Sequence, residues 1–188
     1  MTDRPRAHTF VGISGSLRRG STNTALLVAA QELAPQDVEV VLHPLHEVPF
    51  FDADLEARGY PPAVERLREA VAAADGLLLA SPEYNWSTTG VLKNAIDWLS
   101  RGDPAPLDHK PTALLSGAGG SGGRRAQRHL RDILGHNEVD VLDAAVQVPR
   151  ARRHVEGGVL VTPQHRAEVA RLVAALRERV LERSRQVA

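Results

Sequence analysis

Short apolar segments alternate with longer segments of helical periodicity along the whole chain. The apolar segments are bounded by turn-forming residues and lie near residues 8–14, 38–43, 76–81, 112–117 and 141–148. Segments with apolar residues at helical spacing follow them in turn, near residues 23–34, 62–74, 89–100, 123–135 and 164–184. A repeated strand–helix alternation is typical of a parallel sheet covered by helices on both faces. We therefore expect an α/β fold with a five-stranded parallel sheet.

The length of 188 residues suits one domain that spans residues 1–188. No apolar segment approaches the roughly 18 residues that a membrane-spanning helix needs. The first ten residues, MTDRPRAHTF, also lack the apolar core of a signal peptide. We therefore expect a cytoplasmic protein that does not contact a membrane.

The composition argues against several classes of partner and cofactor. Lys+Arg and Asp+Glu balance at 23 each, so no overall basic field favours nucleic acid or an anionic membrane. The absence of cysteine excludes disulfides, thiolate metal sites, iron–sulfur clusters and cysteine nucleophiles. The eight histidines are scattered, and His43 and His46 would point to opposite faces of a strand. We expect no metal site.

The loop SGSLRRGSTN after the first predicted strand matches neither of two common nucleotide-binding motifs. Gly15 and Gly20 have the spacing of a P-loop, but Ser21 occupies the position of its lysine. The glycines at 12, 15 and 20 also lack the spacing of the dinucleotide-binding fingerprint. These departures argue against an ATPase, a GTPase and a fold of the dinucleotide-binding type.

The same loop is nevertheless rich in groups that bind anions. It places hydroxyls, an amide and a guanidinium directly before a helix, on Ser14, Ser16, Arg18, Ser21, Thr22 and Asn23. Free backbone N–H groups and the helix dipole favour a negative charge at such a position. The loop therefore predicts a site for one phosphate group. The alternative is that Ser21, Thr22 or Asn23 serves only as the helix N-cap.

Two further loops follow strands that would end at the same edge of the sheet. They are SPEYNWSTTG (81–90) and SGAGGSGGRR (116–125). In a sheet of order 2-1-3-4-5 the first, third and fourth strands are neighbours, so the three loops converge. The glycines of the later loop allow close backbone approach to a flat ligand, and the aromatic turn walls one side. A planar heteroaromatic ring with one phosphate fits this set, and flavin mononucleotide (FMN) is the obvious member of that class.

A phospho-receiver protein of the same fold is a rival interpretation. Such a protein needs an aspartate at the end of the third strand and an acidic pair after the first. Here the third strand ends in Ser81 and Pro82, and the first ends in Ser14. The sequence therefore disfavours this rival.

At these residues the chain resembles the NADPH-dependent FMN reductase family, flavodoxin-like enzymes that include quinone, chromate and azo-dye reductases. The matching segments are GISGSLRRGSTNTALL (12–27), PFFDADLE (49–56), SPEYN (81–85), GVLKNAIDWLSR (90–101) and RAQRHLRDIL (125–134). The resemblance spans nearly the whole chain. It implies a flavodoxin-like three-layer sandwich with a five-stranded parallel sheet of order 2-1-3-4-5 and helices on both faces.

The resemblance also implies which residues bind FMN. The phosphate would contact Ser14, Ser16, Arg18, Ser21, Thr22 and Asn23. The ring and ribityl chain would contact Pro82, Glu83, Tyr84 and Asn85, and the ring's other edge would meet Ser116, Gly119 and Gly120. Trp86 lies beside the flavin where the family usually has a small residue or tyrosine, and Thr89 replaces a proline. These two departures bear on the substrate pocket and on loop rigidity.

The implied reaction passes a hydride from NADPH or NADH to flavin N5 and then electrons to a small acceptor. Free FMN, a quinone, an azo dye and a metal oxyanion are the acceptors that the resemblance suggests. The cofactor supplies the chemistry, so we expect no catalytic acid or base. Glu83 is the one candidate acid, and we favour a turn residue that points to solvent or to a neighbouring subunit. The alternative function is a flavodoxin-type electron carrier, which binds FMN without using a nicotinamide donor.

Two groups of arginines are candidates for the extra phosphate that distinguishes NADPH from NADH. One group flanks the glycine-rich loop: Arg124, Arg125, Arg128 and Arg131. The favoured alternative for that group is a solvated helix face. The other group follows the fifth strand, at Arg150, Arg152 and Arg153, and its indication is weaker.

The segment VLKNAIDWL has more apolar positions than one core-facing stripe requires. A leftover apolar face indicates a partner, and the resemblance implies dimers or tetramers, so we expect a homo-oligomer with flavin near the interface. The alternative is a helix that is buried wholly within its own fold. The connection 44–62 is long and rich in proline, as functional or interface segments often are.

Overall fold

The computed structural model describes residues 8–187, so most of the N-terminal stretch considered above as a signal peptide lies outside the described residues. Its central sheet has five parallel strands in the order β2-β1-β3-β4-β5. The strands are β1 (His8–Ser14), β2 (Val38–His43), β3 (Gly76–Ala80), β4 (Thr112–Gly117) and β5 (Val141–Val148). The predicted flavodoxin-like sheet is thereby confirmed in strand position, direction and order.

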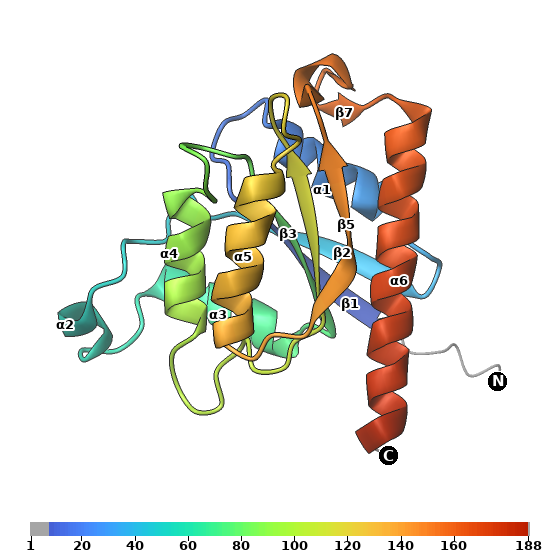
Figure 1. The fold of residues 1–188 in the computed structure, drawn as a ribbon. Coiled ribbons are helices and arrows are strands. Elements are labelled where there is room, and N and C mark those ends of the chain that lie inside the picture. The colour runs from blue at the N-terminus through green and yellow to red at the C-terminus, as the bar shows by residue number, and fades with distance from the viewer. Residues whose placement is uncertain (1–7, 188) are drawn as a thin grey trace.

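Helices cover both faces of this sheet, as Figure 1 shows. One face carries α1 (Thr22–Glu32) and α6 (Pro163–Val187). The other carries α3 (Pro62–Ala73), α4 (Gly90–Leu99) and α5 (Arg124–His136). The sequence did not predict four short elements: α2 (Ala53–Glu56), the 3-10 turn η1 (Ala151–Arg153), and the hairpin of β6 (Val155–Glu156) with β7 (Val159–Leu160).

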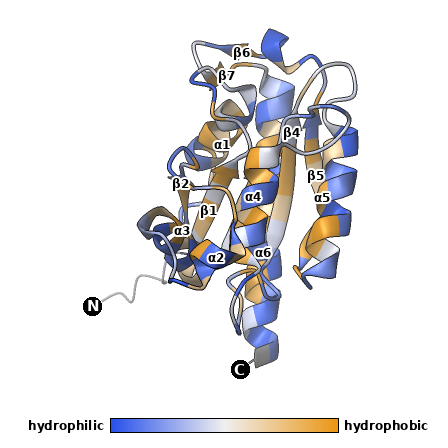
Figure 2. Ribbon diagram, turned by 90° about the vertical axis from the view of Figure 1, so that its left-hand side faces the viewer, coloured by the Kyte–Doolittle hydropathy of each residue, from blue (hydrophilic) through white to orange (hydrophobic). Residues whose placement is uncertain are grey.

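Strand alternation divides the hydrophobic core into two clusters. Phe10 belongs to the cluster under α1 and α6, whereas its neighbour Val11 belongs to the cluster under α3, α4 and α5. Successive strand residues point to opposite faces, so a strand buried on both faces needs a continuous apolar run. β3, with the sequence GLLLA, is buried at every position. In Figure 2, α4 and α5 carry both hydrophobic and hydrophilic residues, as expected of helices with one face on the sheet.

The second apolar face of α4 is covered by another segment of the same chain. This corrects the expectation that the face is free to bind a partner. Trp98 is fully buried, lies 4.9 Å from the ring of Phe51, and donates a hydrogen bond to the Pro49 carbonyl at 2.9 Å. The Asn94 amide donates to the same carbonyl and accepts from the Phe51 N–H. The long connection 44–62 therefore occupies the surface that the sequence reasoning assigned to a partner.

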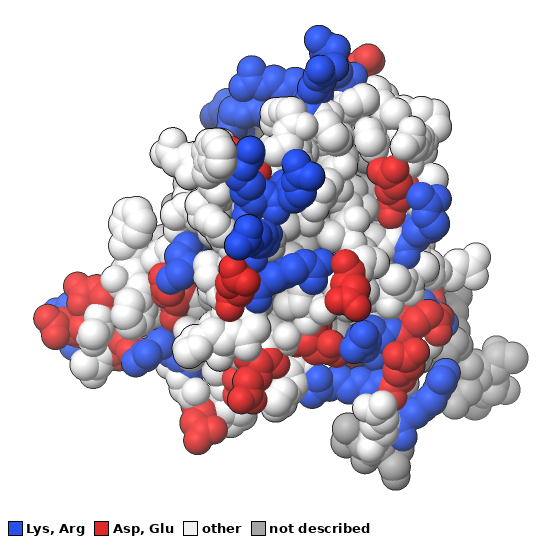
Figure 3. Space-filling model, viewed as in Figure 1, with Lys and Arg blue, Asp and Glu red and all other residues white. Residues whose placement is uncertain are grey.

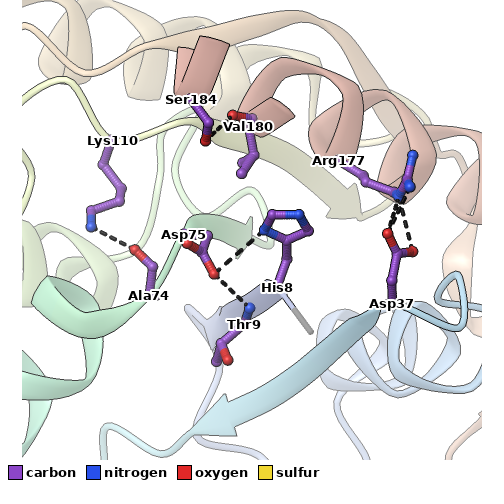
Figure 4. Close-up of polar contacts among 9 residues, drawn as sticks. All are labelled: His8, Thr9, Asp37, Ala74, Asp75, Lys110, Arg177, Val180 and Ser184. Atoms are coloured by element: carbon purple, nitrogen blue, oxygen red, sulfur yellow. Dashed lines mark hydrogen bonds and ion pairs between the residues drawn. The ribbon is translucent and has the colours of Figure 1, made fainter. Parts of the chain in front are cut away.

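At the amino-end edge of the sheet, charged side chains are bonded to other groups of the chain (Figure 4). Arg177 donates to both carboxylate oxygens of Asp37, at 2.8 and 2.9 Å, and these hydrogen bonds lower the pKa of Asp37. Asp75 accepts from the Thr9 N–H at 2.8 Å. Lys110 donates to the Ala74 carbonyl at 2.6 Å, and burial lowers its pKa.

A cavity of about 470 Å³ opens at this edge beside Asp75, Lys110 and Arg183. Arg183 donates to the His109 carbonyl, and the other two side chains have the partners just described. The charged groups at this cavity are therefore accounted for by the fold. Within residues 8–187, no helix combines the length and apolar character needed to cross a membrane.

Candidate functional site

A cavity of about 390 Å³ lies at the carboxyl ends of β1, β3 and β4, where the three unusual loops meet. Small-molecule sites usually have volumes of this order. The predicted residues that line it are Ser16, Arg18, Ser21, Thr22, Asn23, Pro82, Glu83, Tyr84 and Gly119. The cavity lining does not include Ser14, Asn85, Trp86, Ser116 and Gly120. The three loops therefore converge as the sheet order predicts.

The loop after β1 is shaped by hydroxyl groups. Ser14 accepts hydrogen bonds from the Ser16 N–H at 3.3 Å and from the Thr24 hydroxyl at 3.0 Å. Ser21 is the N-cap of α1, because its hydroxyl accepts from the N–H groups of Asn23 and Thr24 at 3.2 and 3.3 Å. The N-cap alternative therefore holds for Ser21, although its side chain also lies at the cavity wall.

Asn23 joins the start of α1 to the end of β4. Its side-chain amide donates to the Gly117 carbonyl and accepts from the Gly117 N–H, both at 2.9 Å. The side chain is buried, so these bonds satisfy groups that water cannot reach. Asn23 therefore fixes the distance between the loop after β1 and the loop after β4.

Thr89 connects the start of α4 to the loop after β1. Its hydroxyl donates to the Gly15 carbonyl at 2.8 Å and accepts from the Leu92 N–H at 3.3 Å. A proline at this position has neither group. The departure at Thr89 therefore adds a link between two of the three loops.

The turn after β3 is a tight hairpin with two residues in the left-handed region. Tyr84 and Ser87 exchange two backbone hydrogen bonds of 3.0 Å, and between them Asn85 and Trp86 have φ of 48° and 67°. Positive φ at both central residues is the pattern of a type I′ turn. A bulky side chain in this region is a strained outlier. Trp86 is 68% exposed, outside the cavity rather than in its wall.

Arg125, at the start of α5, binds this turn in three ways. Its guanidinium lies 3.8 Å from the centre of the Trp86 ring. It also donates to Glu83 at 2.8 Å, and its backbone N–H donates to the other carboxylate oxygen of Glu83 at 3.0 Å. Burial raises the pKa of Glu83, but the hydrogen bonds from Arg125 and Ser121, together with the Arg125 charge, outweigh burial and leave that pKa below its ordinary value. The carboxylate is only 9% exposed, so it does not point to solvent as the sequence reasoning expected.

The loop after β4 is stabilised from beneath by Ser116. Its buried hydroxyl donates to the Gly122 carbonyl at 2.6 Å and accepts from Gln127 at 2.8 Å. Gly123, the N-cap of α5, has φ of 89°, and a Cβ there would meet the Ser116 side chain. Ser116 therefore supports the loop from inside.

At Gly119 and Gly120, a Cβ would have no protein atom within 4 Å. The packing of the chain does not require glycine at either position. A missing side chain that leaves open space beside a cavity allows a ligand to approach the backbone closely.

The cavity also has a wall that sequence reasoning ranked low. Gly117, Ala118, Arg150, Ala151, Arg152 and Arg153 line it, the last four from η1 and the residue before it. The sequence did offer one indication of this wall. The arginine segment follows β5, and the carboxyl end of this parallel strand lies at the same edge of the sheet as the cavity. Arg124, Arg128 and Arg131 instead line a separate cavity with Asp132 and Asp143.

The donors at the cavity suit FMN. At one end are the hydroxyls of Ser16 and Thr22 and the guanidinium of Arg18, beside the amino end of α1. These are the groups that bind a phosphate at a helix N-terminus. The lining also includes Pro82 and Tyr84 from the turn after β3 and Gly119 from the loop after β4, where no side chain fills the space. Among residues 8–187, no group of three potential ligand side chains is arranged to hold a metal ion.

Comparisons with known proteins agree with this chemistry. Residues 9–153 match the family model described as NADPH-dependent FMN reductase. An NAD(P)H-dependent FMN reductase of Pseudomonas aeruginosa is 52% identical over 125 residues, which are 66% of this chain and 68% of that protein. A probable NADPH:quinone oxidoreductase of Oryza sativa is 40% identical over 182 residues, 92% of this chain and 88% of the relative.

A comparison with solved structures also finds a flavin-dependent oxidoreductase. The flavoenzyme NAD(P)H:(acceptor) oxidoreductase FerB from Paracoccus denitrificans superposes with a TM-score of 0.82 and 26% identity, covering 94% of this chain and 98% of that one. Loops, cavity and relatives thus agree, and the chain belongs to the NADPH-dependent FMN reductase family.

Proposed function

We propose that the cavity at the carboxyl edge of the sheet is the FMN site and that a small electron acceptor reacts there. The observation that carries the proposal is one cavity whose lining combines the phosphate-binding groups beside α1 with the turn after β3 and the open backbone of Gly119. Family membership makes the chain an NAD(P)H-dependent flavin oxidoreductase that uses FMN. The flavodoxin-type carrier is therefore not favoured.

The residues have different roles in this proposal. Ser16, Arg18 and Thr22 bind the phosphate, while Pro82, Tyr84 and Gly119 orient the ring. Ser14, Ser21 and Asn23 hold the phosphate loop in shape through their hydrogen bonds. Ser116 supports the glycine-rich loop from beneath. Asn85 and Trp86 form the outer turn at the cavity mouth.

When bound, FMN supplies the acceptance of hydride and the delivery of electrons. The residues of the chain position the flavin and set the charge around it. Glu83 is held ionised by Arg125, so it has no proton to donate at neutral pH. We accordingly assign no catalytic acid or base.

The acceptor site lies beside exposed aromatic side chains. Tyr84 is 56% exposed and lines the cavity, and Trp86 is 68% exposed on the same turn. Flat aromatic surfaces suit a ring-shaped acceptor. We propose a quinone or free flavin as acceptor, and azo dyes or metal oxyanions as further ones. Initial rates with each acceptor at fixed NADPH would rank them, and a lack of turnover with quinone and flavin would contradict the ranking.

We also propose that residues 1–188 form one FMN-binding domain that assembles as a homodimer or homotetramer in the cytoplasm. Two large exposed side chains, Phe50 (81%) and Trp86 (68%), support an interface. Light scattering after gel filtration measures the mass of the assembly, and cell fractionation locates it. A monomer at micromolar concentration would overturn the assembly.

Gly119→Leu tests the position of the ring. The new side chain has open space in the protein but occupies the cavity, so FMN binding should be lost while the far-UV circular dichroism is unchanged. Gly135→Leu, which also has open space and lies away from the cavity, is the matched control. Unchanged FMN affinity in Gly119→Leu, measured by quenching of flavin fluorescence, would overturn the proposed site.

A further inference from the structure

We propose that the arginines after β5 form a second phosphate subsite, which binds the 2′-phosphate of NADPH and makes the enzyme discriminate against NADH. The subsite consists of Arg150, Arg152 and Arg153. This inference rests on the proposed FMN site, because the nicotinamide of NADPH has to lie against the flavin to reduce it.

The first observation is the way the arginine segment is fixed. The Arg150 N–H donates to the Gly119 carbonyl at 2.8 Å, and the Ala151 N–H donates to the Ala118 carbonyl at 3.0 Å. Arg150 itself adopts φ of 49°, a left-handed conformation that is uncommon outside glycine. Backbone strain of this kind persists where the surrounding structure enforces it, often beside a binding site. The segment is thus tied to the loop after β4. It also lies near the start of α1, because a Cβ at Gly117 would be 3.0 Å from the Ala151 Cβ and 3.3 Å from the Thr22 hydroxyl.

The second observation is the state of the charges. Within the part of the chain that the structure describes, the guanidinium groups of Arg150, Arg152 and Arg153 have no acidic side chain within ion-pair distance and no hydrogen bond to the chain. All three are exposed, and all three line the cavity. Figure 3 shows Lys and Arg side chains gathered at the end of the molecule beyond β4 and β5.

The third observation is the count of charges around the cavity. Four arginines line it, namely Arg18 and the three of the subsite, against one acidic residue, Glu83, which is already paired with Arg125. The FMN phosphate has Arg18, two hydroxyls and the start of α1. Three further cations that line the same cavity therefore exceed what one monophosphate needs.

The chemistry of the donor identifies that anion. NADPH and NADH differ by one phosphate monoester, and guanidinium groups bind such a dianion through paired N–H donors. A subsite of two or three arginines thus recognises the phosphate that only NADPH carries. The arginines at the start of α5, the first candidates for this role, are used otherwise: Arg125 binds Glu83 and Trp86, and Arg131 donates to the carbonyls of Leu142 and Asp143.

The test compares NADPH with NADH in the FMN-loaded enzyme. We expect Arg152→Ala/Arg153→Ala to raise the KM for NADPH at least tenfold and to bring the ratio of kcat/KM values for NADPH and NADH close to one. Arg152→Lys/Arg153→Lys should recover part of the ratio, because the charge remains while the paired donors are lost. Arg128→Ala, on an exposed helix position outside the cavity, is the matched control. Circular dichroism and the Kd for FMN are measured on every variant.

Three results would overturn the subsite. One is an unchanged ratio in the double alanine variant. Another is a weaker Kd for FMN with an unchanged ratio, which would assign the arginines to the FMN phosphate. The third is a wild-type enzyme that uses NADH as well as NADPH. If the wild type binds no FMN or oxidises neither nicotinamide, the proposed FMN site fails first, and that outcome is recognisable before any variant is tested.

Discussion

The two edges of the sheet use the same kinds of charged side chain in opposite ways. At the amino-end edge, Arg177 is paired with Asp37, and Lys110 donates to a backbone carbonyl (Figure 4). Arg179 is paired with Asp140. At the carboxyl-end edge, Arg18 and the arginines of the subsite after β5 have no acidic partner among the described residues. At the amino-end edge the charged side chains are bonded to one another or to the backbone, whereas at the carboxyl-end edge unpaired cations line a cavity.

This difference shows why the total charge says little about function here. Lys+Arg and Asp+Glu balance over the whole chain, and the balance hides a local excess of cations at one end. Ion pairs at an exposed edge contribute modestly to stability, because water screens them. Unpaired cations around a cavity instead attract an anionic ligand. Pairing, rather than the number of charges, separates the two edges.

Removing a cavity cation should have the largest effect on ligand binding. Arg18→Ala should weaken FMN binding about 10- to 100-fold, because a charge-assisted hydrogen bond is worth about 1.5–3 kcal/mol. The melting temperature of the FMN-free protein should not change. Titration calorimetry with FMN measures the effect, and the exposed neighbour in Arg19→Ala serves as control. Equal affinity in Arg18→Ala and wild type would remove Arg18 from the phosphate site.

An intermediate effect is expected at Arg125, which is paired with the cavity-lining Glu83. Arg125→Ala removes the partner of a nearly buried carboxylate and the stacking on Trp86, so the turn after β3 should loosen. We expect FMN affinity to fall about fivefold to tenfold, in keeping with about 1 kcal/mol for a contact of this type.

Arg125→Lys separates the charge from the stacked, forked geometry and should recover only part of the affinity. The emission of Trp86, read against a Trp86→Phe variant to subtract Trp98, should shift in Arg125→Ala. An unshifted emission would show that the turn does not depend on Arg125.

The corresponding change at the opposite edge should affect stability alone. Arg177→Ala breaks the pair with Asp37, which is exposed enough for water to replace it in part. We expect a small decrease in melting temperature and an unchanged Kd for FMN. A variant that lost FMN affinity without losing stability would contradict the division between the edges.

The smallest effect should come from pH. The pKa of Glu83 lies below its ordinary value of 4.5, so the pair with Arg125 stabilises the folded state above that pH. The contribution is lost as the pH falls through the folded-state pKa. Trp86 emission should therefore be constant from neutral pH down to about 4.5 and change only below it. A change between pH 7 and 5 would contradict this assignment.

Much of the fold could be predicted because apolar, β-branched segments alternate with helical segments, and the inner strands β3 and β4 are buried throughout. The boundaries of these two strands agree with prediction to within a residue. The short α2, η1 and the β6–β7 hairpin could not be predicted, since they lack the length for periodicity to show. The apolar faces of α4 were misread because periodicity cannot distinguish a partner chain from the chain's own 44–62 connection.

The candidate site could be predicted in place but not in detail. The predicted strand order placed the loops after β1, β3 and β4 at one edge of the sheet. The hydroxyl-rich composition of the loop after β1 indicated where a phosphate would bind. Asn23 was predicted as an anion-binding group, and Ser116 and Glu83 were assigned to the flavin by the family resemblance. Their bonds to Gly117, Gly122 and Arg125 join residues distant in the sequence, so no local pattern shows them.

The most direct test of the account is to load the wild-type protein with FMN and add one equivalent of NADPH without oxygen. The account predicts that the bound flavin bleaches promptly and that its colour returns when a quinone is added. A bound flavin that stays yellow would contradict the oxidoreductase function and favour the electron carrier, and a protein that binds no FMN would contradict both.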